Sequence, residues 1–252
     1  MNKKLCAIYN CWDSTELLKY SVESIKDHVD LIIIVWQKIS NYGESFDPEP
    51  DIEELITTKI QLNHFYPDLK KTGMQNETEK RNIGLAIARS YQCTHFFHID
   101  ADEMYRDFSK LKDAYFRKEE VKPTTDGSVL KIITYFKHPT LSLEKADNYF
   151  VPFIHKLNPD TTAGIQNRYP HYVDPTRRIN ASDVFEITGY MHHYSWVRKD
   201  IERKVRNSSA KANIERSQLL QDYHNPELGP GYFLKDYGQK LIEVPNYFNI
   251  EI

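Results

Sequence analysis

The chain has 252 residues, of which 40% are hydrophobic and 27% are charged, and this is the composition of an ordinary globular protein. A chain of this length buries enough apolar surface to form a core without disulfides, which excludes wholesale disorder, collagen-like repeats and coiled-coil rods. The 33 Lys and Arg residues against 36 Asp and Glu residues give a net charge of −3, which disfavours a sequence-independent nucleic-acid binder.

The longest uninterrupted apolar run, residues 31–36, is far shorter than the roughly 20 residues that cross a bilayer. The N-terminus lacks the sustained apolar segment of a signal peptide. The three cysteines, Cys6, Cys11 and Cys93, form no CxxC pair, which favours a reducing compartment. We therefore expect a soluble, cytoplasmic protein without a transmembrane segment, in the host cytoplasm if the source is a virus.

The first predicted elements form a βαβ unit. Residues 4–10 predict a strand, and Asp13 with Glu16 three positions later is a variant of the capping box that begins a helix. Apolar residues at helical spacing extend this helix over residues 13–28. Residues 31–36 are a continuous apolar run, typical of a strand that is buried on both faces in a parallel sheet.

Alternating strands and helices continue along the chain. The further predicted elements are strands at 60–64, 94–99, 128–136, 150–156 and 184–191 and helices at 76–92, 108–120 and 197–212, with a short helix through Tyr223. Residues 37–51 and 158–180 are expected to be loops. The pattern predicts an α/β fold with a mixed, mostly parallel central sheet flanked by helices, and a helical C-terminal extension. Residues 1–224 are predicted to form one domain, with an irregular tail, 225–252, packed on it.

Two carboxylates follow the strand predicted at 94–99. Ligands of open α/β sheets bind at the carboxyl ends of the strands, where Asp100 and Asp102 both reach one site. Their hard oxygen atoms suit Mg²⁺ or Mn²⁺, which complete their coordination with substrate phosphates. The alternative is a solvated acidic turn, because Asp is common after strands.

The context of this pair resembles a known family. A helix with the sequence Arg-Asn-Ile-Gly-Leu-Ala at 81–86, upstream of Asp-Ala-Asp-Glu at 100–103, resembles the nucleotide-sugar-dependent glycosyltransferases of the GT-A fold and is most similar to family 2. The resemblance covers roughly residues 4–105. It implies a Rossmann-like GT-A domain, a nucleoside-diphosphate sugar donor with UDP-sugar favoured, Mn²⁺ or Mg²⁺ as cofactor, and a glycan or other hydroxyl acceptor.

The resemblance also implies residue roles. The nucleotide sugar is expected to contact Tyr9, Asn10, Gln37, Asn41, Arg81, Asp100, Arg198 and Lys204. Family 2 enzymes usually have an Asp at the position of Gln37, so the nucleotide stays open, although an amide can still bind a base or a ribose. Arg198 and Lys204 are expected to neutralise the leaving diphosphate. The alternative for these cations is a solvated basic helix.

A histidine pair ends the strand predicted at 184–191. Adjacent strand residues face opposite sides, so one of His192 and His193 is expected to face the site. In many GT-A enzymes a C-terminal histidine completes the metal shell, and we expect Asp100, Asp102 and His193 to be the metal ligands. With diphosphate oxygens, such a mixed set suits Mn²⁺ better than Mg²⁺. The alternative is a histidine pair in the core or on the surface.

The catalytic base is less clear from the sequence. An inverting transferase needs a general base for the acceptor hydroxyl, whereas a retaining enzyme does not. Asp174, Asp183 and Glu186 lie in the right region, and Asp174 and Glu186 are our candidates, beside a catalytic Asp102 that would act through the metal. Stereochemistry, sugar, acceptor and oligomeric state stay open.

Two other functions fit part of the pattern. A nucleotidyltransferase-like metal-phosphate enzyme has a similar sheet, but the first strand is followed by no glycine-rich phosphate loop. An inactive carbohydrate-binding module fits the aromatic content of 13%, which includes 17 tyrosines. The intact Asp100, Asp102 and His193 argue against that module.

Overall fold

The computed structural model describes residues 3–13, 15–45, 59–208 and 218–252. The strands are β1 (Leu5–Cys11), β2 (Leu31–Trp36), β3 (Ile60–His64), β4 (His95–Asp100), β5 (Glu103–Met104), β6 (Gly127–Phe136), β7 (Leu141–Leu143), β8 (Phe150–Lys156), β9 (Val184–Trp196), β10 (Phe233–Leu234) and β11 (Gln239–Glu243). The helices are α1 (Thr15–Glu23), α2 (Gly73–Ser90), α3 (Phe108–Val121), α4 (Ile201–Asn207) and α6 (Leu219–His224), with 3₁₀ turns η1 (Lys26–His28) and η2 (Pro175–Arg177).

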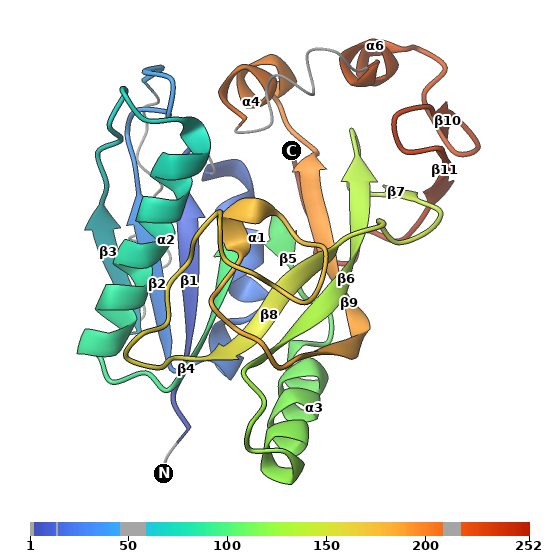
Figure 1. Cartoon of the computed structure of the whole chain (residues 1–252). Helices are drawn as coiled ribbons and strands as arrows, with labels where there is room; N and C mark the ends of the chain where they lie inside the picture. Colours follow the sequence, from blue (N-terminus) through green and yellow to red (C-terminus); the bar gives the residue numbers. More distant parts are fainter. Residues whose placement is uncertain (1–2, 14, 46–58, 209–217) are drawn as a thin grey trace.

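These strands form one mixed sheet in the order β10-β11-β7-β6-β8-β4-β1-β2-β3, and β9 pairs with both β6 and β5 (Figure 1). The centre is parallel: β1 lies between β2 and β4, so that Ile8 is opposite both Ile33 and His98. Every residue of β1 and β2 is buried, because helices cover both faces. The predicted α/β fold class is confirmed.

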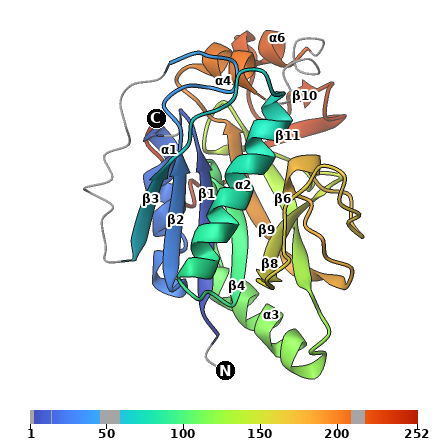
Figure 2. The same ribbon diagram turned by 60° about the vertical axis from the view of Figure 1, so that its left-hand side comes forward.

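Alternate residues of β1 enter two different cores. Leu5, Ala7 and Tyr9 pack with α1 and α3, whereas Cys6 and Ile8 pack with α2. Figure 2 shows α2 lying along its own face of the sheet. A Cβ atom on Gly84 of α2 would lie 2.2 Å from Cγ2 of Ile8, so the absence of a side chain lets the helix approach the strand closely. Asn10, two residues after Ile8, faces the same side of the sheet and lies near the end of β1 on the α2 side.

The second half of the sheet brings a long strand to the same edge. β8 is antiparallel to both β4 and β6, and β9 runs parallel to β6 along its other side. β9 continues to Trp196, opposite Phe136, rather than ending at the predicted residue 191. The predicted 197–212 helix therefore begins only at Ile201, and its last predicted residues, 209–212, lie outside the described residues.

Helix starts also differ from the predictions. The α2 helix begins at Gly73 because Thr72 and Gln75 form a reciprocal capping box ahead of the predicted start. The first helix ends at Glu23, and η1 follows it separately. The carboxylate of Asp13, the expected cap, binds Arg203 of α4, with its Oδ2 atom 2.7 Å from Nε.

The segment from residue 225 on was expected to be irregular, but it contains β10 and β11. Strand β11 pairs antiparallel with β7, which places Leu241 opposite Leu143 and buries both. A domain boundary at residue 224 remains a prediction. In the part of the chain that the structure describes, no helix is long and apolar enough to cross a bilayer.

Candidate functional site

A cavity of about 300 Å³ opens where β1, β2 and β4 end. Asn10 of β1, Gln37 after β2 and Asp100 of β4 line it, because the carboxyl ends of parallel strands meet at one edge of the sheet. Further walls come from α2, β9 and α4. The cavity thus forms where the sequence predicted a site.

Most of the predicted site residues meet here. The ones that line the cavity are Asn10, Gln37, Asn41, Asp100, Asp102, Asp174, His193, Arg198 and Lys204. Arg81 lies behind them, with Nη2 3.5 Å from Oδ1 of Asp100.

Two predicted residues lie elsewhere. Tyr9 faces the opposite side of the sheet from Asn10, where its fully buried hydroxyl lies 2.9 Å from Oγ of Ser21. Glu186 is exposed on β9, with a carboxylate oxygen 4.0 Å from Nζ of Lys131. The structure therefore brings neither Tyr9 nor Glu186 to the cavity.

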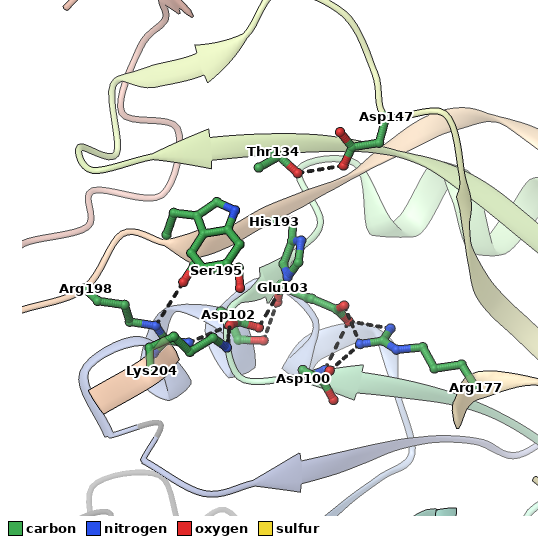
Figure 3. A network of polar contacts seen from close by, with 12 residues as sticks. Asp100, Asp102, Glu103, Thr134, Asp147, Arg177, His193, Ser195, Arg198 and Lys204 are labelled. Atoms are coloured by element: carbon green, nitrogen blue, oxygen red, sulfur yellow. Dashed lines mark hydrogen bonds and ion pairs between the residues drawn. The ribbon is translucent and has the colours of Figure 1, made fainter. Parts of the chain in front are cut away.

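Arg177 joins two acidic residues at the end of β4 (Figure 3). Its Nη2 atom donates to both Asp100 and Glu103, and its Nη1 lies 3.0 Å from Oε2 of Glu103. Burial favours the neutral form of Asp100, but Arg177 and Arg81 outweigh it and lower the pKa of Asp100 to about 2. Burial raises the pKa of Glu103 to about 7, and the charge of Asp100 adds to this rise.

Asp102 is bound by two cations (Figure 3). Its Oδ2 atom lies 2.5 Å from Nη2 of Arg198 and 3.0 Å from Nζ of Lys204, and its Oδ1 lies 3.8 Å from Nε2 of His193. Although burial opposes it, Lys204 and Arg198 hold the pKa of Asp102 well below its usual range, so this side chain is a carboxylate. Burial lowers the pKa of His193, which favours its neutral imidazole.

These contacts bear on the predicted metal site. Among the described residues, no group of three or more His, Cys, Asp or Glu side chains is arranged to hold a metal ion. Asp100 is neutralised by Arg177 and Asp102 by Arg198 and Lys204, so the oxygen atoms that Mn²⁺ or Mg²⁺ would need already accept from cations. As arranged, Asp100, Asp102 and His193 do not fit a divalent ion.

Amide groups and a buried lysine form another wall. Nζ of Lys80 donates to Oε1 of Gln37 at 2.9 Å, and Nε2 of Gln37 lies 3.3 Å from Oδ1 of Asn41. Burial lowers the pKa of Lys80 to about 8. Both polar side-chain atoms of Asn10 are buried without a hydrogen-bond partner among the described residues. Asn10 therefore offers the cavity a donor and an acceptor that a polar ligand can use.

Several polar residues of this site are not among the predicted site residues: Glu77 and Lys80 line the cavity, and Glu103 and Arg177 adjoin Asp100 next to it. Glu103 belongs to the acidic run at 100–103, and that run was the signal for it. Arg177 lies in the long loop after β8, where no periodicity indicates which end of the sheet the loop approaches. Its contacts with Asp100 and Glu103 follow from the fold alone.

No protein-family model matches the chain, and no curated protein matches it. Among solved structures it is similar to a 4-diphosphocytidyl-2C-methyl-D-erythritol synthase, at 11% identity and a TM-score of 0.38, over 74% of this chain and 90% of that one. It is also similar to glucosyl-3-phosphoglycerate synthase from Mycobacterium tuberculosis in complex with Mn²⁺, UDP and phosphoglyceric acid, at 11% identity and a TM-score of 0.44, over 96% of this chain and 87% of that one. Likenesses at this level carry no functional argument, and the GT-A family 2 resemblance remains a prediction from the sequence.

Proposed function

We propose that this chain is a glycosyltransferase that moves a sugar from a nucleoside-diphosphate sugar, with UDP-sugar favoured, to a glycan or another hydroxyl acceptor. The cavity at the sheet edge carries the proposal. It combines amides suited to a base or ribose, Asn10 and Gln37, with cations suited to a diphosphate, Arg198 and Lys204. Open α/β sheets bind their ligands at this edge.

The chemistry follows from these groups. The bond between the anomeric carbon and the diphosphate oxygen breaks, and the bonding electron pair leaves with the nucleoside diphosphate. The acceptor oxygen forms the new bond to the anomeric carbon and loses its proton. Fixed positive charge beside the departing diphosphate stabilises the transition state, because the charge is in place before the reaction begins.

Asp174 is the proposed base for an inverting reaction. It lines the cavity, and its Oδ1 atom accepts from the amide and the hydroxyl of Thr176, at 2.8 and 2.9 Å. These bonds fix the carboxylate, and no hydrogen bond between described residues uses its Oδ2 atom. That oxygen is the one that would take the acceptor proton.

The other functions have weaker support. Much of the aromatic content that suggested a carbohydrate-binding module lies in the core, where Tyr9, Tyr105, Tyr115, Tyr135 and Tyr194 are fully buried. β1 ends at Cys11 and is followed by Trp12 and Asp13, without the glycines of a phosphate loop. A nucleotidyltransferase would release pyrophosphate from a nucleoside triphosphate, whereas the proposed enzyme releases a nucleoside diphosphate from a nucleotide sugar.

A thermal-shift screen of UDP, GDP, CMP and dTDP, each with and without Mn²⁺, tests donor binding first. A ligand that binds only the folded state raises its stability, so we expect one nucleoside diphosphate to raise Tm. Release of that nucleotide from its sugar conjugates then tests transfer. Asp174→Asn is expected to slow release at least tenfold with little change in nucleotide affinity, and Asp160→Asn, an exposed carboxylate of the same loop, is the control. The proposal fails if no nucleotide shifts Tm, and pyrophosphate release from a triphosphate would favour the nucleotidyltransferase.

A further inference from the structure

We propose that Arg198 and Lys204 bind the donor diphosphate directly, in the place that sequence analysis assigned to a divalent cation. The inference rests on the proposed function and states how that same site holds its ligand. The observation behind it is that both predicted metal carboxylates are already paired with cations of this chain.

Arg198 is a built part of the cavity wall. It is 8% exposed, and its Nε and Nη2 atoms are fixed by the carbonyl of Ser195 and by Asp102. The hydroxyl of Tyr223 donates to its carbonyl oxygen at 2.8 Å, which anchors the backbone. Its Nη1 atom is buried and makes no hydrogen bond within the described chain, lying 3.5 Å from Oε1 of Glu16. Nη1 thus forms an ion pair with Glu16 while its hydrogen-bonding capacity stays unused, and a phosphate oxygen of the donor can take up that capacity.

Lys204 approaches the same carboxylate from α4. Its ammonium has three N–H donors, of which the described contacts use one, for Asp102 at 3.0 Å. Its side chain is 30% exposed and lines the cavity, so the remaining donors are accessible to a ligand. Asp102 and Glu16 together carry two negative charges against the two positive charges of Arg198 and Lys204, so this group offers a ligand its unused N–H donors rather than a surplus of positive charge.

This arrangement gives Asp102 a positioning role. It holds the guanidinium and the ammonium together, and phosphate oxygens accept strongly from such charged donors. A divalent ion at Asp102 would have to displace both cations. A diphosphate displaces neither cation, because it binds the N–H groups of Arg198 and Lys204 that do not donate to Asp102.

Titration calorimetry with UDP, on the full chain, tests the inference. We expect the same Kd, within about twofold, in excess EDTA and in Mn²⁺. Lys204→Met, which keeps the length and removes the charge, is expected to raise Kd in EDTA by about tenfold or more, since it removes charge-assisted hydrogen bonds. Lys204→Arg should retain most of the affinity. Lys199→Met, at an exposed lysine that does not line the cavity, is the matched control and should leave Kd unchanged.

Asp102→Asn distinguishes a residue that positions the cations from a metal ligand, because the two roles change the affinity for UDP in opposite directions. If Asp102 only positions the cations, its neutralisation frees them, and UDP binds in EDTA as tightly as before or more tightly. If Asp102 is a metal ligand, the variant loses Mn²⁺-dependent binding. Circular dichroism checks that Asp102→Asn is folded. If Asp102→Asn does not fold, the affinity of Lys204→Met for UDP in EDTA tests the inference instead.

The outcomes for the inference and for the proposed function differ. Binding of UDP to the wild type only in Mn²⁺ overturns the inference and leaves the proposed function standing. An unchanged Kd in Lys204→Met also overturns it. Absence of binding by UDP, GDP, CMP and dTDP, with and without Mn²⁺, overturns the proposed function and the inference with it.

Discussion

Arg177 links acidic residues that are close in sequence to each other but remote from Arg177 itself. It is 5% exposed and contacts Asp100 and Glu103, which is 2% exposed. Removing one partner of a buried ion pair leaves an uncompensated charge, and this costs more than the pair itself contributes. Arg177 is therefore expected to be the most sensitive cation of the loop after β8.

We expect Arg177→Met to lower the free energy of unfolding by about 3–5 kcal/mol, measured by urea denaturation at pH 8. Arg168→Met, at an exposed arginine of the same loop, should change it by less than about 0.5 kcal/mol. A loss below about 1 kcal/mol for Arg177→Met would contradict the prediction and would mean that Glu103 becomes neutral when Arg177 is absent.

The sequence predicted which residues lie at the site better than it predicted which of them pair with each other. The Asp-Ala-Asp run after an apolar strand indicated the cavity edge, and the parallel order of β1 and β4 brought Asn10 there as well. The partners of Asp102 lie about a hundred residues away, at Arg198 and Lys204, and no local pattern encodes that contact. The sequence indicated carboxylates and cations near one site but not that they neutralise each other.

At the scale of elements, the contact between α2 and β1 depends on one missing side chain. Gly84→Ala would place a Cβ atom 2.2 Å from Cγ2 of Ile8. Overpacking typically costs about 1–3 kcal/mol, and the better helix propensity of alanine returns up to about 1 kcal/mol. We expect a net loss of about 1–2 kcal/mol in the free energy of unfolding by urea denaturation.

Ala86→Gly serves as the calibration, because residue 86 is exposed on the same helix. This variant should lose about 1 kcal/mol through helix propensity alone. A neutral or stabilising Gly84→Ala, with Ala86→Gly behaving as expected, would show that α2 moves away from the sheet without cost.

His155 of β8 predicts a pH dependence. Its imidazole accepts from the hydroxyl of Tyr169, lies 3.0 Å from the carbonyl of Phe153, and is 1% exposed. Burial lowers its pKa from the ordinary 6.5 to about 4. The folded state thus stays neutral where the unfolded state is protonated, so its contribution is complete above pH 6.5 and is lost as the pH falls toward 4.

Urea denaturation between pH 4.5 and 7.5 measures how the free energy of unfolding changes with pH. His155→Gln keeps an acceptor for Tyr169 and removes the titration, so the loss of stability on acidification should be shallower by up to about 1.4 kcal/mol per pH unit. His138→Gln, at an exposed histidine, should follow the wild type. If the free energy of unfolding of His155→Gln and of the wild type fell equally with pH, His155 would be ruled out as a source of the pH dependence.

Elements with a strong apolar pattern were predicted well, and several short strands were not. β2 matches its predicted bounds because continuous burial produces a continuous apolar run. β5, β7 and β11 are too short to show a period, and their existence depends on partners elsewhere in the chain. β9 was cut short in the prediction because polar residues, including His192 and His193, interrupt its apolar pattern.

At the scale of the whole molecule, the C-terminal segment is part of the core. Leu234, Leu241 and Ile250 are 1%, 0% and 3% exposed. Each such side chain contributes about 1.5–3 kcal/mol by burial, and together they approach the total stability of a typical domain. We expect a chain truncated after residue 224 to lose cooperative thermal unfolding in calorimetry.

Removal of residues 251 and 252 alone, both exposed, should leave the transition in place. If the chain truncated after residue 224 unfolds cooperatively near the temperature of the full chain, residues 225–252 are an appendage, as the sequence suggested. The same pair of truncated chains therefore tests the domain boundary.

The order of strands in the sheet also affects how the chain is made. β1 pairs with both β2 and β4, yet the second neighbour of β4 is β8, which follows β4 in the chain only after β5, α3, β6 and β7. While a ribosome synthesises the intervening residues, β4 presents an open edge beside Phe96 and Phe97, which are fully buried in the finished molecule. Unpaired apolar edges recruit other strands, so nascent chains are exposed to edge-to-edge association until β8 emerges. Pairing of β8 with β4 is therefore the step that protects the nascent chain from edge-to-edge association.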